Sequence, residues 1–337
     1  MTRELEENPL ECGEVRMGEV KVWKWLGQHL SSGGLGDSVA ATVAAREGKV
    51  RGAGLEIAQI VNDWRARAVG GLDTALLLWE VCVIPSLLYG AGTWVEITAA
   101  TTKALNNLQR WFLRLVLQVP QGTPTASLTW ETGLLDMGLR VKIEKLLLVF
   151  HLRSLDKETL ARQVYEEQKQ KMWPGLAEEA KDICKYLDIE DVNITNLSKK
   201  EFKEVAVEAA MKQDERELRS LAEKSDKCQR MLIDGYGRKQ YFKEQNIFKA
   251  REYFRTRVNM QRFAGNFSND RNFARTSWMC RCGLEREEVA HITSGTCPTY
   301  RDIYERHDDL SKDEGLVKFF GEVLARRDAL DQEEVIV

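Results

Sequence analysis

The chain has 337 residues, of which 43% are hydrophobic and 30% charged, and this composition is typical of a globular protein long enough for two domains. No apolar run reaches the length that spans a bilayer, and the early glutamates Glu4, Glu6 and Glu7 are not typical of a secretory signal. The net charge is −3, and the seven cysteines include four that stand far apart, which favours reduced thiols over a disulfide framework. These features predict an intracellular protein of the nucleus or cytoplasm, without membrane contact.

The first predicted elements are a short β-hairpin and two helices. Residues 20–27 are rich in β-branched and aromatic residues and end in glycine, and a turn cluster of serine and glycine follows at 31–34. Residues 1–36 are therefore assigned to a hairpin region. An aspartate that suits an N-cap opens an alanine-rich helical pattern over 37–48, and a second helical pattern covers 53–69.

The next part of the chain predicts a helical domain over residues 37–156. Residues 72–97 are the most hydrophobic part and predict buried core, in which Pro85 should kink or break a helix. The sequence Tyr-Gly-Ala-Gly at 89–92 predicts a close backbone contact. Three further helices are expected, over 98–118, 125–132 and 138–155. In the first of these, Arg110 and Arg114 share the side opposite the apolar positions.

The charge pattern divides the rest of the chain into three parts. Residues 157–226 are highly charged and helical, and they predict a solvated helical connector. Residues 227–310 form a basic segment that ends in a cluster of cysteines and histidine, and residues 311–337 predict a C-terminal helix or tail. The predicted fold class is therefore mainly α, with one short hairpin near the N-terminus.

The basic segment carries most of the evidence for a polyanionic partner. Between Lys227 and Arg281 there are thirteen Lys and Arg against four Asp and Glu, so this segment has a charge of +9 and the remaining chain −12. On a helix over 247–263, arginines would form a row beside an apolar stripe, as phosphate binding along a nucleic acid requires. The alternative is a solvated face above core aromatics. The residues assigned to nucleic-acid contact are Arg251, Arg255, Arg257, Arg262, Arg271, Arg275 and Arg281.

A candidate metal site follows the basic segment. Cys280, Cys282, His291 and Cys297 have the spacing C-x-C-x8-H-x5-C, and thiolates with imidazole are the ligands that Zn²⁺ prefers in closed structural sites. Gly283 suits a tight turn with positive φ after the second cysteine. The alternative is scattered core cysteines and a surface histidine. The pattern favours a structural zinc ion.

Four segments, in this order, resemble non-LTR retrotransposon reverse transcriptases. Residues 23–28 (Trp-Lys-Trp-Leu-Gly-Gln) with 30–33 look like the "KYLG" hairpin that follows the catalytic palm of that family. Residues 84–94 are similar to its "P-x-L-L-Y-G-x-x-x-W" segment in the thumb region. Residues 123–133 resemble its "TP … E-x-G" stretch, and the four metal-ligand candidates, with Pro298, resemble its C-terminal CCHC knuckle. The resemblance covers residues from about 20 to about 305.

The resemblance implies a thumb-like helical bundle with a zinc knuckle, but without the family's catalysis. Polymerase chemistry needs paired aspartates that hold two metal ions, and in this family they lie upstream of the hairpin. No aspartate precedes Val22 here, so the chain is predicted not to be an enzyme and to have no small-molecule substrate. The predicted function is binding of RNA, DNA or a template–primer duplex. The alternatives are a protein-interaction scaffold and a fragment that completes a reverse transcriptase supplied by another, polymerase-containing chain.

Overall fold

The computed structural model describes residues 11–12, 15–16, 21–62, 71–95, 97–171, 175–189, 197–263, 279–307 and 309–335. These residues are mainly α-helical, which confirms the predicted fold class. The strands are β1 (Glu11–Cys12), β2 (Val15–Arg16), β3 (Val22–Trp25) and β4 (Gln28–Ser31). The helices of the first half are α1 (Leu35–Asn62), α2 (Leu72–Leu78), the π-helix η2 (Trp79–Val83), α3 (Ile84–Leu87), the short η3 (Ala91–Thr93), α4 (Ala99–Leu117), α5 (Thr125–Thr132) and α6 (Met137–Ser154).

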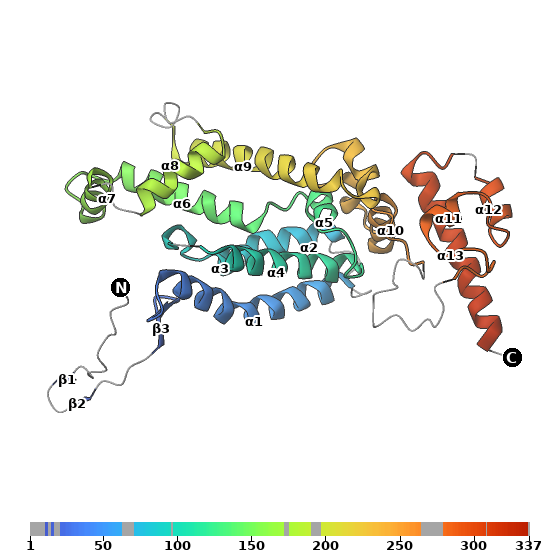
Figure 1. Cartoon of the computed structure of the whole chain (residues 1–337), viewed down its shortest axis with the longest axis horizontal. Coiled ribbons are helices and arrows are strands. Elements are labelled where there is room, and N and C mark those ends of the chain that lie inside the picture. The colour runs from blue at the N-terminus through green and yellow to red at the C-terminus, as the bar shows by residue number, and fades with distance from the viewer. Residues whose placement is uncertain are drawn as a thin grey trace.

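The helices of the second half are α7 (Leu160–Gln170), α8 (Leu176–Tyr186), α9 (Lys199–Ala222), the short η5 (Asp226–Cys228), η6 (Arg230–Asp234) and η7 (Gln240–Lys243), α10 (Ile247–Arg257), α11 (Val289–Thr293), α12 (Arg301–Glu305) and α13 (Asp313–Val335). The long helices α1 and α4 lie side by side, and α6 with α9 forms a second layer, while α11, α12 and α13 lie together at one end of the molecule (Figure 1). The predicted helices over 98–118, 125–132 and 138–155 are confirmed by α4, α5 and α6.

The predicted hairpin is confirmed, and α1 fixes it to the helices. β3 pairs with β4 in antiparallel register, and the two turn residues have positive φ, 47° at Leu26 and 81° at Gly27, as a tight hairpin turn requires. Arg46 of α1 donates hydrogen bonds to the carbonyls of Gly27 (2.9 Å), Leu87 (2.7 Å) and Tyr89 (2.9 Å). One guanidinium therefore joins two of the segments that carry the family resemblance.

The two helices predicted over 37–48 and 53–69 are a single helix through Asn62, so the predicted break at Gly48 is wrong. Residues 63–69 of the second prediction lie outside the described residues. Gly54 is buried inside α1, and a Cβ built there would lie 2.8 Å from Cζ3 of Trp111 on α4. Glycine lowers helix propensity but allows two helices to approach closely. The packing of α1 on α4 therefore outweighs the local propensity of its glycines.

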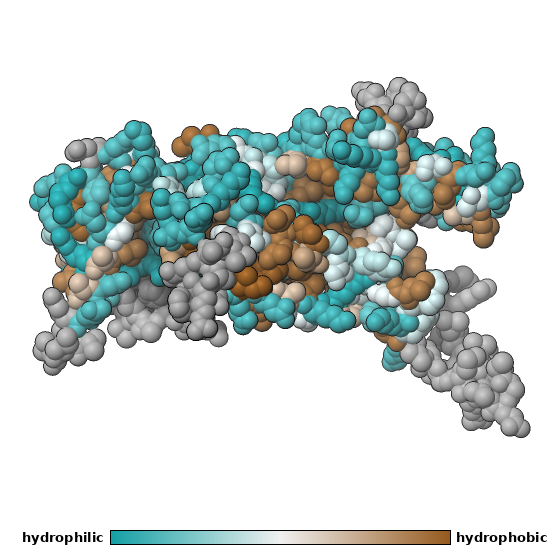
Figure 2. Space-filling view, turned by 180° about the vertical axis from the view of Figure 1, so that it is seen from behind, coloured by the Kyte–Doolittle hydropathy of each residue, from teal (hydrophilic) through white to brown (hydrophobic). Residues whose placement is uncertain are grey.

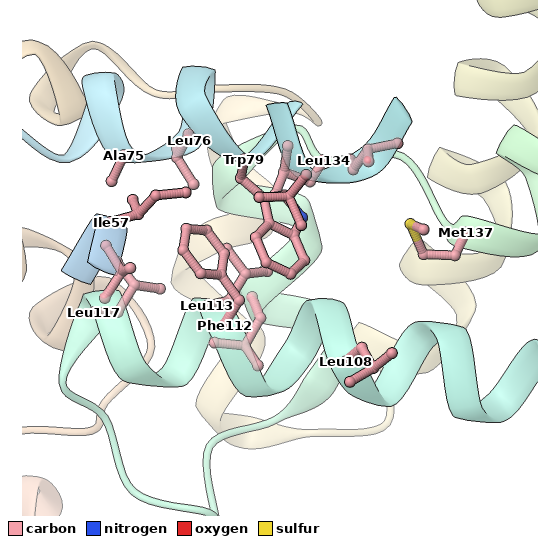
Figure 3. Packing of buried hydrophobic residues seen from close by; sticks show 14 of the residues in the cluster. Ile57, Ala75, Leu76, Trp79, Leu108, Phe112, Leu113, Leu117, Leu134 and Met137 are labelled. Atoms are coloured by element: carbon pink, nitrogen blue, oxygen red, sulfur yellow. The ribbon is translucent and has the colours of Figure 1, made fainter. Parts of the chain in front are cut away.

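The main core lies between α1, α2 and α4 (Figure 3). The ring of Trp79 stacks on Phe112 with centroids 4.1 Å apart and an interplanar angle of 8°. Regular α-helix ends at Leu78, a π-helical turn follows, and α3 begins with Pro85 in its first turn. Proline has no N–H to donate, and the widened turn directly before it accommodates the missing bond, so the chain stays helical past Pro85 and is not broken there.

The charged residues 157–226 do more than connect, and the prediction of a solvated connector is wrong. Every fourth residue along α9 is buried, and half of the buried positions are alanine, including Ala206 and Ala210, with Phe202 before them. Alanine lets α9 approach α6 closely, and Phe202 stacks on Phe150 with centroids 4.8 Å apart. The apolar sides of α7 and α8 join this second core. Its charged residues cover the outer surface.

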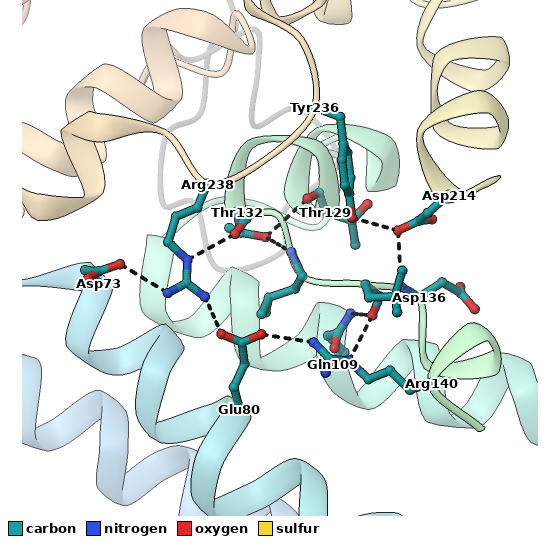
Figure 4. A network of polar contacts seen from close by, with 12 residues as sticks. Asp73, Glu80, Gln109, Thr129, Thr132, Asp136, Arg140, Asp214, Tyr236 and Arg238 are labelled. Carbon is teal, nitrogen blue, oxygen red and sulfur yellow. Dashed lines mark hydrogen bonds and ion pairs between the residues drawn. The ribbon is translucent and has the colours of Figure 1, made fainter. Parts of the chain in front are cut away.

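The segment from Lys227 to Phe263 also belongs to the bundle. Phe242, Ile247 and Phe254 share one core with α1, α2 and α4, so the predicted boundary at 227 does not separate two cores. The predicted apolar stripe of α10 is buried as expected, although α10 ends at Arg257 and is shorter than predicted. Arg238 lies between Asp73 (3.2 Å) and Glu80, and so ties this segment to α2 and the π-helix (Figure 4).

A second polar group joins α9 to the start of α6 through Asp214, which is 3% exposed (Figure 4). Its Oδ2 accepts hydrogen bonds from the Tyr236 hydroxyl (3.0 Å) and the Asp136 N–H (3.2 Å). The pKa of Asp214 is raised from 3.8 to about 6. Burial is the largest cause and the charges of Asp136 and Glu217 add to it, while the two hydrogen bonds oppose the change.

We expect the Asp214→Asn variant to be more stable than the wild type at neutral pH. The folded protein binds this proton more tightly than the unfolded chain, so the contribution of Asp214 to stability falls as pH rises from about 4 to about 6. Asparagine does not titrate, so the variant avoids this loss of stability. A pKa shift of this size corresponds to a loss of up to about 3 kcal/mol at pH 7. Urea unfolding at pH 4 and pH 7 measures it. A variant that is less stable than the wild type at pH 7, and no worse at pH 4, would contradict the assignment.

The opposite face of the molecule shows hydrophilic side chains above and below a group of apolar ones in the middle (Figure 2). On α2 and the π-helix, Leu77 is 52% exposed and Val81 63%. Within the described ranges, no helix combines the length and the apolar character needed to cross a membrane.

Candidate metal centre and basic face

The four residues predicted as metal ligands lie together. One ligand atom from each of Cys280, Cys282, His291 and Cys297 falls within 4.8 Å of the others. The sulfurs of Cys280 and Cys297 are 3.6 Å apart, and Cys282 Sγ is 3.2 Å from His291 Nε2. Ligands of a tetrahedral zinc ion lie about 3.5–3.8 Å apart, given zinc–sulfur bonds of about 2.3 Å. The cluster could therefore hold one metal ion with little movement.

A tight turn places the first two ligands. Gly283 N donates to Cys280 O (2.9 Å), Cys280 N donates to Glu285 O (2.8 Å), and Gly283 has the predicted positive φ, 74°. The N–H of Leu284 points at Cys282 Sγ (3.5 Å). Backbone donors aimed at sulfur stabilise a thiolate. The turn therefore both orients the ligands and favours the charge that they carry when they bind a metal.

Burial and hydrogen bonding affect the thiols differently. Burial raises the pKa of Cys280 and of Cys297, which are 3% and 1% exposed. Cys282 is more open, and although burial opposes it, hydrogen bonds from Leu284 N–H, Cys280 and His291 lower its pKa to about 7. His291 Nδ1 lies 3.2 Å from Glu285 Oε2, which is within ion-pair distance but without hydrogen-bond alignment. A carboxylate on that side favours Nε2 as the ligand atom.

The metal cluster has a core of its own, to which α13 contributes. Cys280, Cys297 and Tyr300 pack against Phe319 and Phe320 of α13, together with side chains from α11 and α12. The predicted C-terminal helix is therefore confirmed but is part of the knuckle. Arg281, predicted to contact nucleic acid, is half-buried and forms an ion pair with Asp331 of α13. This arginine joins the knuckle to α13.

The predicted row of phosphate-binding arginines on α10 is wrong for its inner members. Arg251 and Arg255 are each 1% exposed, and they lie at the end of α4. Arg251 Nε donates to Val116 O (2.8 Å), its Nη2 donates to Asn62 Oδ1 (2.7 Å), and Arg255 Nη2 donates to Gln118 O (2.8 Å). The last carbonyls of a helix lack intrahelical donors and carry partial negative charge. The two guanidiniums therefore cap α4.

Arg257 is also buried, at 4% exposure, and its charge is neutralised internally. It binds both carboxylate oxygens of Glu131 on α5, at 2.8 and 3.1 Å, and its Nη1 lies 2.7 Å from Asp313 Oδ2 and 2.6 Å from Asp234 Oδ2. Of the remaining predicted arginines, Arg262 is exposed. The calls on Arg271 and Arg275 lie outside the described residues.

The structure presents a different basic surface on α1 and α4, here called the α4 face and defined by Arg51, Arg110, Trp111 and Arg114. The sequence of α4 contains Lys103, Arg110 and Arg114 but no acidic residue. Arg51 stacks over the Trp111 ring at 4.9 Å from its centroid, and its one ion pair among the described residues is with Glu47 at 2.8 Å.

Two arginines of the α4 face lack counter-charges. Within the described ranges, no carboxylate forms an ion pair with Arg110 or Arg114. Burial lowers the pKa of Arg114, and the positive charge of Arg110 lowers it further. Two neighbouring guanidiniums without an acid produce a positive potential that an anion would relieve. The shared side of Arg110 and Arg114 was visible in the sequence, but the larger charge of residues 227–281 drew the prediction there.

Comparison of the chain with protein-family models, with curated proteins and with solved structures finds no match in any of the three.

Proposed function

We propose that the four-residue cluster binds one zinc ion in a structural role. Three thiols and an imidazole favour Zn²⁺ over the hard cations that prefer oxygen ligands. Four protein ligands close the tetrahedron, so no position is open for the water that a catalytic zinc ion carries. Three of the four side chains are at most 5% exposed and form part of a packed core, as a structural site requires.

We propose further that the chain binds nucleic acid through the α4 face. The observation that carries it is a helix with three basic and no acidic residues, on which Arg110 and Arg114 have no ion-pair partner among the described residues. Guanidinium groups bind phosphate in fork geometry, and the plane of a guanidinium such as that of Arg51 adds a surface on which a base can stack. The resemblance to the thumb region of non-LTR reverse transcriptases supports the same partner.

The structure changes which residues the binding experiment should target. The double variant Arg110→Gln/Arg114→Gln removes two half-buried charges from the α4 face, and we expect it to weaken binding of a template–primer duplex. The slope of log K against log salt is negative, and each lost phosphate contact should make it about one unit less steep. The double variant should therefore make it about two units less steep. Fluorescence anisotropy with a labelled duplex, between low and physiological salt, measures the slope.

The matched control removes the same number of positive charges elsewhere. Lys200→Gln/Lys224→Gln takes two exposed lysines from α9 and the turn after it, and it should leave the slope unchanged. Equal losses in both double variants would mean that only net charge matters and would contradict a site on α4. The absence of catalysis remains a prediction from the sequence.

A further inference from the structure

The two outer edges of the β3–β4 hairpin differ in how their backbone groups are hydrogen-bonded. On the outer edge of β4, His29 N donates to Thr42 Oγ1 (2.8 Å), and that hydroxyl is within 3.4 Å of His29 O. Ser31 N donates to Ser38 Oγ (2.8 Å). Both hydroxyls come from the first turns of α1. They satisfy backbone groups that would otherwise be available to another strand, so this edge is closed.

The outer edge of β3 is open. Ser32 N donates to Lys21 O (3.0 Å), and because facing and outward pairs alternate in an antiparallel ladder, Val22 and Lys24 direct their backbone groups away from β4. Among the residues that the structure describes, nothing donates to or accepts from these groups of Val22 and Lys24. Two N–H and two C=O groups therefore form an edge without hydrogen-bond partners among the described residues.

The strand at this open edge and the turn after it carry apolar side chains that are exposed to solvent. Val22 is 43% exposed, Trp23 46%, Trp25 63% and Leu26 72%. Natural edge strands are usually protected by bulges, proline or inward-pointing charge, and a two-stranded hairpin is only marginally stable by itself. Arg46 holds the turn on the helices, so the edge is already fixed in the extended conformation that strand addition requires.

We propose that β3 pairs with β3 of a second copy of this chain, across a two-fold axis, to form a four-stranded antiparallel sheet. The N–H and C=O groups of Val22 would form hydrogen bonds with those of Lys24 of the partner subunit. The groups of Lys24 would likewise bond those of Val22 of the partner subunit, which gives four hydrogen bonds. Trp23 would lie opposite Trp23 of the partner subunit in the close, non-hydrogen-bonded pair between them.

The side chains of β3 suit this register. Lys21 would face Trp25 of the partner subunit, which is a cation–π pair, and the two central tryptophans would form an aromatic pair. Lys24 would face Val22 of the partner subunit, so no two like charges lie directly opposite each other. The partner strand thus covers the exposed tryptophans and avoids repulsion. The interface is small, so the dimer should be weak and depend on concentration.

Proline at position 24 tests the proposal without disturbing the hairpin. The N–H of Lys24 points outward, so Lys24→Pro removes no bond within the hairpin but deletes one intermolecular donor on each copy. Sedimentation equilibrium of the full-length chain should show the wild-type average mass rising with concentration from 38.6 kDa towards twice that value. Lys24→Pro should remain at the monomer mass, with unchanged helical content by circular dichroism.

Lys24→Thr is the matched control, because threonine keeps the N–H and favours strands. It should dimerise like the wild type. A wild-type chain that stays monomeric at all concentrations would overturn the proposal, as would a Lys24→Pro variant that dimerises normally. Loss of the dimer in Lys24→Thr would assign association to the lysine charge and would also overturn it. These outcomes depend neither on zinc nor on nucleic-acid binding.

Discussion

Removal of the metal is expected to unfold the C-terminal unit, from Met279 to the end of α13, while the helices before residue 155 stay folded. Structural zinc contributes about 10–16 kcal/mol in isolated finger peptides. Without it, the turn and the short helices that carry the ligands depend on one small hydrophobic core against α13. Cys282→Ser, which removes one ligand, should have the same effect. Elemental analysis should find one zinc per chain in the wild type and none in the variant.

Hydrogen exchange locates the effect. Amide protection should be lost in α11, α12 and α13 and retained in α1, α4 and α6. Cys82→Ser is the control, because Cys82 is an exposed free thiol outside the cluster, and it should change neither metal content nor protection. A metal-free chain with full protection of residues 279–307 would contradict a structural role for the metal.

Glu131→Gln is expected to destabilise the whole bundle by about 3–5 kcal/mol. Glu131 is 0% exposed. It accepts two hydrogen bonds from Arg257 and one from the Tyr241 hydroxyl at 2.8 Å. Burial alone would lower the pKa of Arg257, but the hydrogen bonds and charge of Glu131 outweigh it and raise the pKa above its ordinary value. Removing one partner of a buried pair leaves the other charge poorly compensated.

The loss should be near 3 kcal/mol, because Asp313 and Asp234 still contact Arg257 in the variant. Denaturant unfolding measures it. Glu208→Gln is the matched control, since Glu208 forms an ion pair with Lys212 at 2.8 Å in which both side chains are more than 60% exposed. Such an exposed, solvent-screened pair contributes little to stability. Equal, small losses in both variants would contradict a stabilising role for the buried network.

The sequence predicted best where local signals and packing agree. The hairpin turn needs two residues with positive φ. These are Leu26 and Gly27, and the glycine is the signal that the sequence shows. Helix α6 begins at Met137 because Asp136 accepts hydrogen bonds from Gly138 N and Leu139 N, a cap that is recognisable in the sequence. The spacing of the metal ligands likewise depends on one short segment of chain.

Features that depend on distant contacts could not be predicted. The continuity of α1 through Gly54 depends on Trp111, more than fifty residues later in the chain. The arginines of α10 have the periodicity of a solvated face, and only the position of the end of α4 shows that they are helix caps. The alanines of α9 resemble those of an exposed helix until α6 is placed against them.

The salt dependence of nucleic-acid binding by the wild-type chain tests the proposed function most directly. If three or four phosphates contact the α4 face, log K for a template–primer duplex should fall linearly with log salt, with a slope of about −2 to −3.5. The titration should use metal-loaded protein, so that the knuckle is folded. If the chain does not bind a duplex, structured RNA or single-stranded DNA even at low ionic strength, nucleic-acid binding through the α4 face is contradicted.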